Sequence, residues 1–264
     1  MSADHKCGIH LYDNSQYCYL HKAIDFNNRD VVNAILETRH NCVNATLQDG
    51  RSALYAAAFH KCLEIVQTLV WHGANINARD SFDNTPLLLA AGSSDIELLT
   101  FLIDHGADTC CENRAGTNIC HRLAQFSNVS TAQRLFGLYG DIQYQLLNRA
   151  DHCGQIPLHY AAMLGHLELV SFFINCGANP NYRNAMDQTP LHVAAIWGKV
   201  EIIEALIHFE VADVKANSCG ITWTAWQYFE QNFPDHQDKE KVKQLLCPQK
   251  IYMPNFEQSV LTCK

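Results

Sequence analysis

The sequence has little of what would assign it to a membrane or to nucleic acid. It has no apolar run long enough to span a bilayer, and Met1 to Cys7 lack the apolar core of a secretory signal. We therefore expect neither membrane insertion nor secretion. Lysine and arginine together number 19 against 27 aspartates and glutamates, which gives a formal charge of -8. Because phosphate binding needs clustered positive charge, this balance argues against a nucleic-acid partner.

Well-known catalytic signatures are also missing. The sequence has no Gly-rich phosphate loop, no H-E-x-x-H and no G-x-S-x-G, so we expect no enzyme, no catalytic residue and no cofactor. The alternative from another class is an enzyme whose residues meet only in space. A closed polar pocket near Cys120, His121 and Asp141 would favour it.

The twelve cysteines lack the regular spacing of a disulfide framework, and Cys110 and Cys111 are adjacent. This pattern favours reduced thiols that act as small hydrophobic side chains, and hence a cytoplasmic location. A zinc-dependent module is the alternative, because Cys7, His10, Cys18 and His21 supply four potential ligands near the N-terminus. The two pairs lie closer together than in common zinc fingers, so we expect no metal site.

One short motif recurs along most of the chain. It reads Ser52–Ala58, Thr85–Ala91, Ile156–Ala162 and Thr189–Ala195. The residue two positions before each copy belongs to a column with intervals of 33 residues, except for one interval of 38: Gly50, Asp83, Gly116, Gly154, Asp187 and Gly220. A unit of this length cannot bury its apolar face alone, so it must stack on its neighbours.

A second signature follows several copies at a fixed distance, as in His72–Ala78, His105–Asp108 and Cys176–Asn181. With these two signatures the chain resembles the ankyrin-repeat family. The resemblance implies an all-α solenoid of stacked helix-turn-helix units with hairpin-like fingers. The residues agree, since threonine caps a helix, proline suits its first turn and glycine ends the second helix.

The repeats divide the chain into three parts. We expect an N-terminal segment over 1–16, an ankyrin-repeat domain over 17–247 and a tail over 248–264. Within the domain, the unit 116–153 is irregular, and its five additional residues fall around 137–147, as an extended second helix or an added turn. The last unit, 220–247, reads as a polar cap in which Thr224, Ala225 and Trp226 replace Thr-Pro-Leu.

The resemblance places the binding surface on a concave face, formed by the ends of the first helices and by the fingers. The column at these helix ends reads His60, Ser93, Phe126, Leu164, Trp197 and, in the cap, Glu230. Large apolar residues gather in its C-terminal half, and exposed apolar patches usually mark partner surfaces. The candidate protein-binding residues are Phe59, His60, Phe126, Met163, Leu164, Ile196 and Trp197, with Phe82, Arg114, Arg183 and Met186 on the fingers. Met163 and Ile196 could equally pack between helices.

The predicted function is therefore to bind another protein, as an adaptor, inhibitor or recruiter, with the chain monomeric. The chain is also similar to ankyrin-repeat effectors that intracellular bacteria deliver into host cells, in which case the location is the host cytoplasm. The resemblance further implies asparagine hydroxylation at Asn44 and Asn77, each with Leu eight residues before it and Ala after it.

Overall fold

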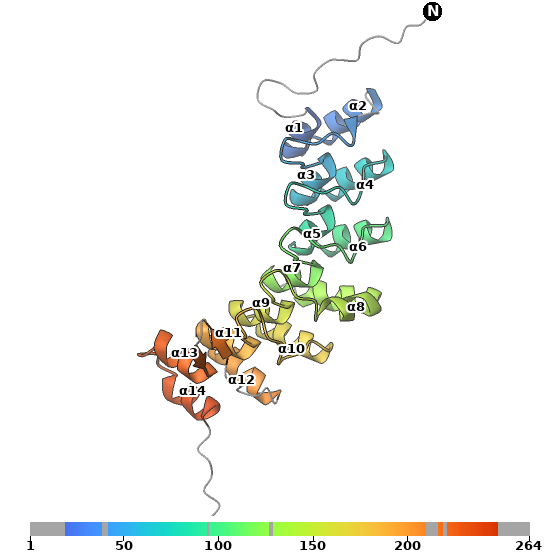
Figure 1. The fold of residues 1–264 in the computed structure, drawn as a ribbon. Helices are drawn as coiled ribbons and strands as arrows, with labels where there is room; N and C mark the ends of the chain where they lie inside the picture. The colour runs from blue at the N-terminus through green and yellow to red at the C-terminus, as the bar shows by residue number, and fades with distance from the viewer. Residues whose placement is uncertain are drawn as a thin grey trace, which may run out of the picture.

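Across the residues that the structure describes, seven helix pairs stack into one curved rod, with the odd-numbered helices along the inner side of the curve (Figure 1). The computed structural model describes residues 19–38, 42–93, 95–126, 129–209, 216–218 and 221–247, with backbone only at 140–144, 216–218, 221 and 222. The inner helices are α1 (Tyr19–Asp25), α3 (Ala53–Phe59), α5 (Pro86–Ala91), α7 (Ile119–Phe126), α9 (Pro157–Leu164), α11 (Pro190–Ile196) and α13 (Ala225–Asn232). The outer helices are α2 (Arg29–Thr38), α4 (Leu63–Trp71), α6 (Ile96–Asp104), α8 (Val129–Leu146), α10 (Leu167–Asn175), α12 (Val200–His208) and α14 (Lys239–Leu246). The predicted all-α solenoid is confirmed.

The recurring motif starts α3 and α5 in the predicted way. The Thr85 hydroxyl accepts a hydrogen bond from the Leu88 amide at 3.3 Å, and Pro86 occupies the first turn, where no N–H is needed. Ser52 does the same for α3, accepting from the Tyr55 amide at 3.1 Å. Where isoleucine stands at the cap position of α9, the buried His159 ring accepts from the Ile156 amide instead, at 3.3 Å. The cap is thus supplied by whichever polar side chain the unit carries.

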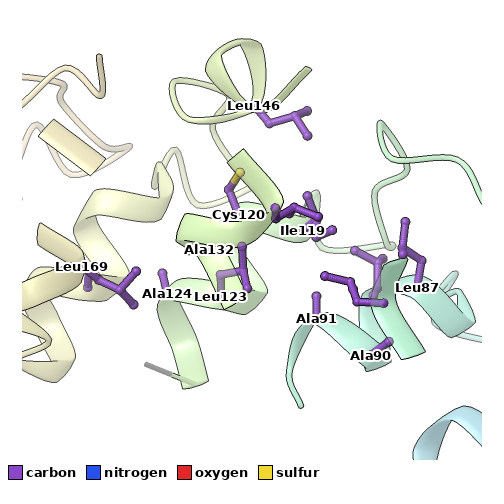
Figure 2. Close-up of a cluster of buried hydrophobic side chains, with 14 of the residues drawn as sticks. Leu87, Ala90, Ala91, Ile119, Cys120, Leu123, Ala124, Ala132, Leu146 and Leu169 are labelled. Atoms are coloured by element: carbon purple, nitrogen blue, oxygen red, sulfur yellow. The ribbon is translucent and has the colours of Figure 1, made fainter. Parts of the chain in front are cut away.

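The core is continuous through the stack, both within each pair and between neighbouring pairs (Figure 2). Ala90 and Ala91 of α5 are fully buried and let α7 approach closely, so that Ile119 and Leu123 fill the space between them. Outer helices close the same cluster from behind, with Ala132 and Leu146 from α8. Each unit therefore depends on the next one for burial of its apolar surface.

The fingers are joined by backbone hydrogen bonds from one unit to the next. The Arg114 amide donates to the Phe82 carbonyl at 2.8 Å, and the Ala185 amide donates to the Cys153 carbonyl at 3.1 Å. The recurring Gly/Asp column stands at these turns with positive φ, as at Gly154 (+72°) and Asp187 (+60°). A Cβ at Gly154 would lie 2.5 Å from the Ala185 nitrogen, so only glycine fits there.

Asparagines after the second helices hold successive units together. The Asn77 side chain donates to the Gly106 carbonyl at 3.2 Å and accepts from the Asp108 amide at 2.8 Å. Asn44 and Asn148 make the equivalent pairs of bonds one unit further along in each case, at 2.7–3.1 Å. These two-bond bridges explain why asparagine recurs at this column. Hydroxylation of Asn44 and Asn77 stays a prediction.

The irregular unit carries an extended second helix, as predicted. Helix α8 has 18 residues, whereas α4, α6, α10 and α12 have nine each. Its path bends at Tyr139, whose φ of -133° and ψ of 39° are not helical, and the Tyr139 hydroxyl hydrogen-bonds to the Asp104 carboxylate of the preceding unit. Leu146 and Leu147 are buried again, so the extra residues leave the frame of the stack intact.

The cap differs from the prediction in its phase. A two-stranded antiparallel hairpin, β1 (Ala216–Ser218) with β2 (Ile221–Trp223), precedes α13, and Thr224 caps that helix. Measured from the helix starts, α13 is displaced by two residues from the 33-residue period. Asn232 therefore stands where Trp197 stands in the preceding unit, and the placement of Glu230 in that column is wrong. The Asn232 side chain donates to the Ile196 carbonyl at 3.2 Å.

Three motif histidines are buried hydrogen-bonding groups. The Nε2 atoms of His21, His121 and His159 lie 2.9–3.0 Å from the carbonyls of the following finger. The His159 Nδ1 accepts the Ile156 amide, so its Nε2 carries the proton and the ring is neutral. Burial lowers the pKa of the His159 imidazole from 6.5 to about 4, and burial also lowers the pKa of His21 and of His121.

These histidines predict a stability that falls in mild acid. The unfolded chain binds a proton at each histidine below about pH 6.5, while folded His159 stays neutral down to about pH 4, so the free energy of unfolding decreases between these values. For His159 alone the loss is at most roughly 3 kcal/mol. We expect the urea midpoint to be lower near pH 5 than near pH 7.5, and the difference to shrink in His159→Gln. The exposed His152→Gln variant serves as control, and equal wild-type midpoints would contradict the prediction.

Candidate protein-binding surface

The inner helices place three large apolar side chains in one line at their C-terminal ends. Phe126 and Leu164 are the last residues of α7 and α9, and Trp197 directly follows α11. Their side chains are 50%, 40% and 56% exposed. These residues occupy equivalent positions in three consecutive units, at the ends of the inner helices. We call Phe126, Leu164 and Trp197 the apolar row.

Two predicted residues flank this row in half-buried positions. Met163 in α9 and Ile196 in α11 each precede a member of the row and are neither fully exposed nor part of the fully buried core. Each therefore divides its surface between helix packing and solvent. Both can complete an apolar patch with the row, although their contribution to packing makes them poor choices for mutation.

The N-terminal half of the predicted column is separate from the row. Phe59 is 64% exposed and packs its ring edge-on against His60, with 5.4 Å between ring centroids, and the His60 Nε2 lies 3.1 Å from the Asp25 carboxylate. The next unit interrupts the column, because Gly92 has no side chain and Ser93 is buried. The predicted residues thus form two groups, of which the C-terminal one has a member in each of three consecutive units.

The row is anchored at Phe126. A Cβ on Gly92 would lie 3.0 Å from the Phe126 ring, so the ring rests on the glycine of the preceding unit. On its other side, the Arg122 guanidinium carbon lies 4.9 Å from the ring centroid, within the range of a cation–π interaction. The Phe126 side chain is therefore held in place before any partner arrives.

The fingers place four predicted residues in the solvent. Phe82 is 65% exposed and Met186 51% exposed, while Arg114 and Arg183 also lie on the surface. Arg183 pairs with Asp187 at 2.5 Å, and both side chains of this pair are exposed. Thr117 and Gln188 are finger residues whose polar side chains suggest an exposed position, but both are buried. Each is 5% exposed, because the neighbouring unit covers the side of the finger.

Arg122 is an inner-face residue that the sequence reasoning missed. It stands in the column after the motif histidine, where the other complete repeats carry Ala56, Leu89, Tyr160 and Val193. The signal in the sequence was its positive charge, because apart from Lys22 of the first unit the repeats carry a neutral side chain at this position. Arg122 is half-buried and donates from Nε to the Leu88 carbonyl at 3.2 Å.

The structure describes some of the residues of the alternative catalytic and zinc sites. Cys120 and His121 are fully buried, and the His121 ring bonds to the Asn118 side chain at 2.8 Å and the Gln155 carbonyl at 2.9 Å, so neither residue can reach a substrate. The Asp141 side chain lies outside the described residues. Of the four potential zinc ligands only His21 is described, and its Nε2 faces the Arg51 carbonyl. Over the described ranges, no three His, Cys, Asp or Glu residues are arranged to hold a metal ion.

Comparison with known proteins identifies the family. The family model described as "Ankyrin repeats (3 copies)" matches residues 3–80 and 120–218, and the one described as "Ankyrin repeat" matches 82–114. The chain belongs to the ankyrin-repeat family. Its repeats make it a protein–protein interaction module. In the part of the chain with described structure, no helix has both the length and the apolar character to cross a membrane.

Similar proteins are much longer than the region they share with this chain. Transient receptor potential cation channel subfamily A member 1 of Drosophila melanogaster is 33% identical over 145 residues, which is 52% of this chain and 12% of that protein. Rabankyrin-5 of Mus musculus is 31% identical over 178 residues, which is 62% of this chain and 15% of that protein. Among solved structures, a chain of the complex of the Bd0816 predatory endopeptidase from Bdellovibrio bacteriovorus with immunity protein Bd3460 superposes with a TM-score of 0.64. The two chains are 25% identical, and the superposed region covers 72% of this chain and 96% of the other.

The exposure of the row predicts that its tryptophan contributes little to folding. Trp197→Ala should change the free energy of unfolding by about 0.5 kcal/mol or less, as is usual for exposed positions. Trp226, which is 8% exposed and stacks on Phe229, provides the contrast, and Trp226→Ala should cost about 3–5 kcal/mol. Urea titration of both variants checks this. Similar losses in the two would mean that Trp197 is part of the core.

Proposed function

We propose that this chain binds a partner protein through the apolar row and the flanking fingers, as an adaptor, inhibitor or recruiter. The supporting observation is that three consecutive inner helices each end in a large, exposed apolar side chain. Exposed apolar groups that form a contiguous surface carry a hydration cost, which a partner relieves. Tryptophan and phenylalanine are also among the side chains that contribute most to binding.

The scaffold favours such binding because it is ordered in advance. Phe126 is held between Gly92 and Arg122, and the fingers beside the row are fixed to each other by backbone hydrogen bonds. Little conformational entropy is then lost when a partner docks, so more of the burial free energy appears as affinity. The shallow, open face suits a protein surface better than a small molecule, which needs an enclosing pocket.

We place this activity in a reducing compartment such as the cytoplasm. Among the described cysteines, Cys62, Cys110, Cys111, Cys120, Cys153 and Cys176 have free thiols, and Cys111 and Cys120 are packed in the core. Burial raises the pKa of the Cys120 thiol, which keeps it protonated and unreactive. These thiols serve as small apolar groups, as expected of an intracellular protein.

Removing the row should abolish capture of the partner. We expect the triple variant Phe126→Ala, Leu164→Ala, Trp197→Ala to lose a specific set of proteins in affinity capture from cell extract. Trp197→Ala alone should weaken binding of a protein from that set by about 2 kcal/mol or more, as measured by calorimetry.

The matched control is Trp71→Ala, which removes an equally large side chain, 69% exposed, from the end of outer helix α4. It should retain the full set of captured proteins. Loss of the same proteins with Trp71→Ala, or their retention by the triple variant, would contradict the proposed surface.

A further inference from the structure

The Arg122 guanidinium, on the inner helix α7, uses only part of its hydrogen-bonding capacity. Its Nε donates to the Leu88 carbonyl at 3.2 Å and its Nη1 donates to the Gln125 side chain at 3.1 Å. Both acceptors are neutral, and neither of these two hydrogen bonds uses the N–H groups of Nη2. The planar group is fixed in orientation by these two bonds and by the Phe126 ring beneath it. It is therefore a preorganised donor.

No acidic side chain in the described part of the chain pairs with this cation. The described ion pairs of the repeats involve other arginines, as in Arg149 with Glu112 and Arg183 with Asp187. The finger carboxylate of Asp80 is occupied, since it accepts from the amides of Phe82 and Asn84 and from the Asn84 side chain. Burial lowers the pKa of Arg122, which reflects the cost of holding a half-buried charge without a counterion.

A hollow of about 420 Å³ lies directly in front of the guanidinium. It is lined by Phe82, Asn84, Asn113, Arg114, Ala115 and Arg122. The Asn113 side chain donates to the Asn84 side chain at 3.0 Å, which fixes the finger side of the hollow. Arg114 lies 3.6 Å from Asp83, so its charge is largely balanced. One positive charge, that of Arg122, is left over.

We infer that this hollow binds a carboxylate side chain of the partner, in a segment where an aspartate or glutamate neighbours an apolar residue that packs on Phe126. The inference rests on the proposed function and specifies the partner's chemistry. A guanidinium binds carboxylate through paired, charge-assisted hydrogen bonds, and the adjoining aromatic ring provides the apolar contact. A single unpaired cation matches the single charge of a carboxylate, whereas a doubly charged phosphate group would leave one charge unbalanced beside Asp83.

Peptide selection tests this inference without knowledge of the natural partner. A display library of random short peptides is selected on the wild-type protein, and one selected peptide is synthesised with its acidic residue and with the corresponding amide. Binding of both is measured to wild type, to Arg122→Gln and to the exposed Arg134→Gln of α8 as control. With wild type and Arg134→Gln, the change to amide should weaken binding about tenfold or more. With Arg122→Gln it should have little effect.

Each outcome bears on the inference. Arg122→Lys, which keeps the charge, should retain part of the acid preference even if Arg122→Gln is less stable. Selected peptides without acidic residues, or the same penalty for the amide on Arg122→Gln, would overturn the inference. If peptides that fail this test still lose binding when the apolar row is mutated to alanine, the proposed function is supported and only the carboxylate inference is wrong. Failure to select any peptide that depends on the row would count against both.

Discussion

The close approach of successive helix pairs is the interaction on which the rest of the structure depends. Ala90 and Ala91 of α5, like Ala161 and Ala162 of α9, are completely buried against the neighbouring unit. A larger side chain there would separate the helices and open the core between them. The core continues from each pair into the next, so every unit is stabilised by its neighbours, and the largely polar α14 ends the series against water.

The binding surface is a consequence of this stacking. Because the inner helices repeat in register, residues at equivalent positions of successive repeats come near one another in space. Phe126, Leu164 and Trp197 therefore form a row although they are far apart in the sequence. The same register brings Arg122 beside Phe82 and Asn84 of the preceding finger, while the Leu88 carbonyl of α5 and the Gln125 side chain of α7 orient its guanidinium. The two ends of this surface differ, because the charge of Arg122 lies at one end of the apolar row. A partner therefore has one preferred orientation on it.

The sequence was sufficient for the fold and for the position of the row, because both follow from a period that repeats several times. It was insufficient where one unit modifies the next. Thr117 and Gln188 have polar side chains typical of an exposed finger, yet the adjacent finger covers them. The cap is shifted by two residues, so Asn232 rather than Glu230 continues the column. Arg122 was overlooked because a single charge inside a motif gains meaning only when its surroundings are known.

The central claim is that the apolar row is covered when the partner is bound. Hydroxyl-radical footprinting of the chain alone and with its captured partner measures this at individual side chains. The account predicts that oxidation of Phe126, Leu164 and Trp197 falls on binding, while the exposed Trp71 on the outer helices is oxidised equally in both states. Protection of Trp71 with an unchanged row would contradict it.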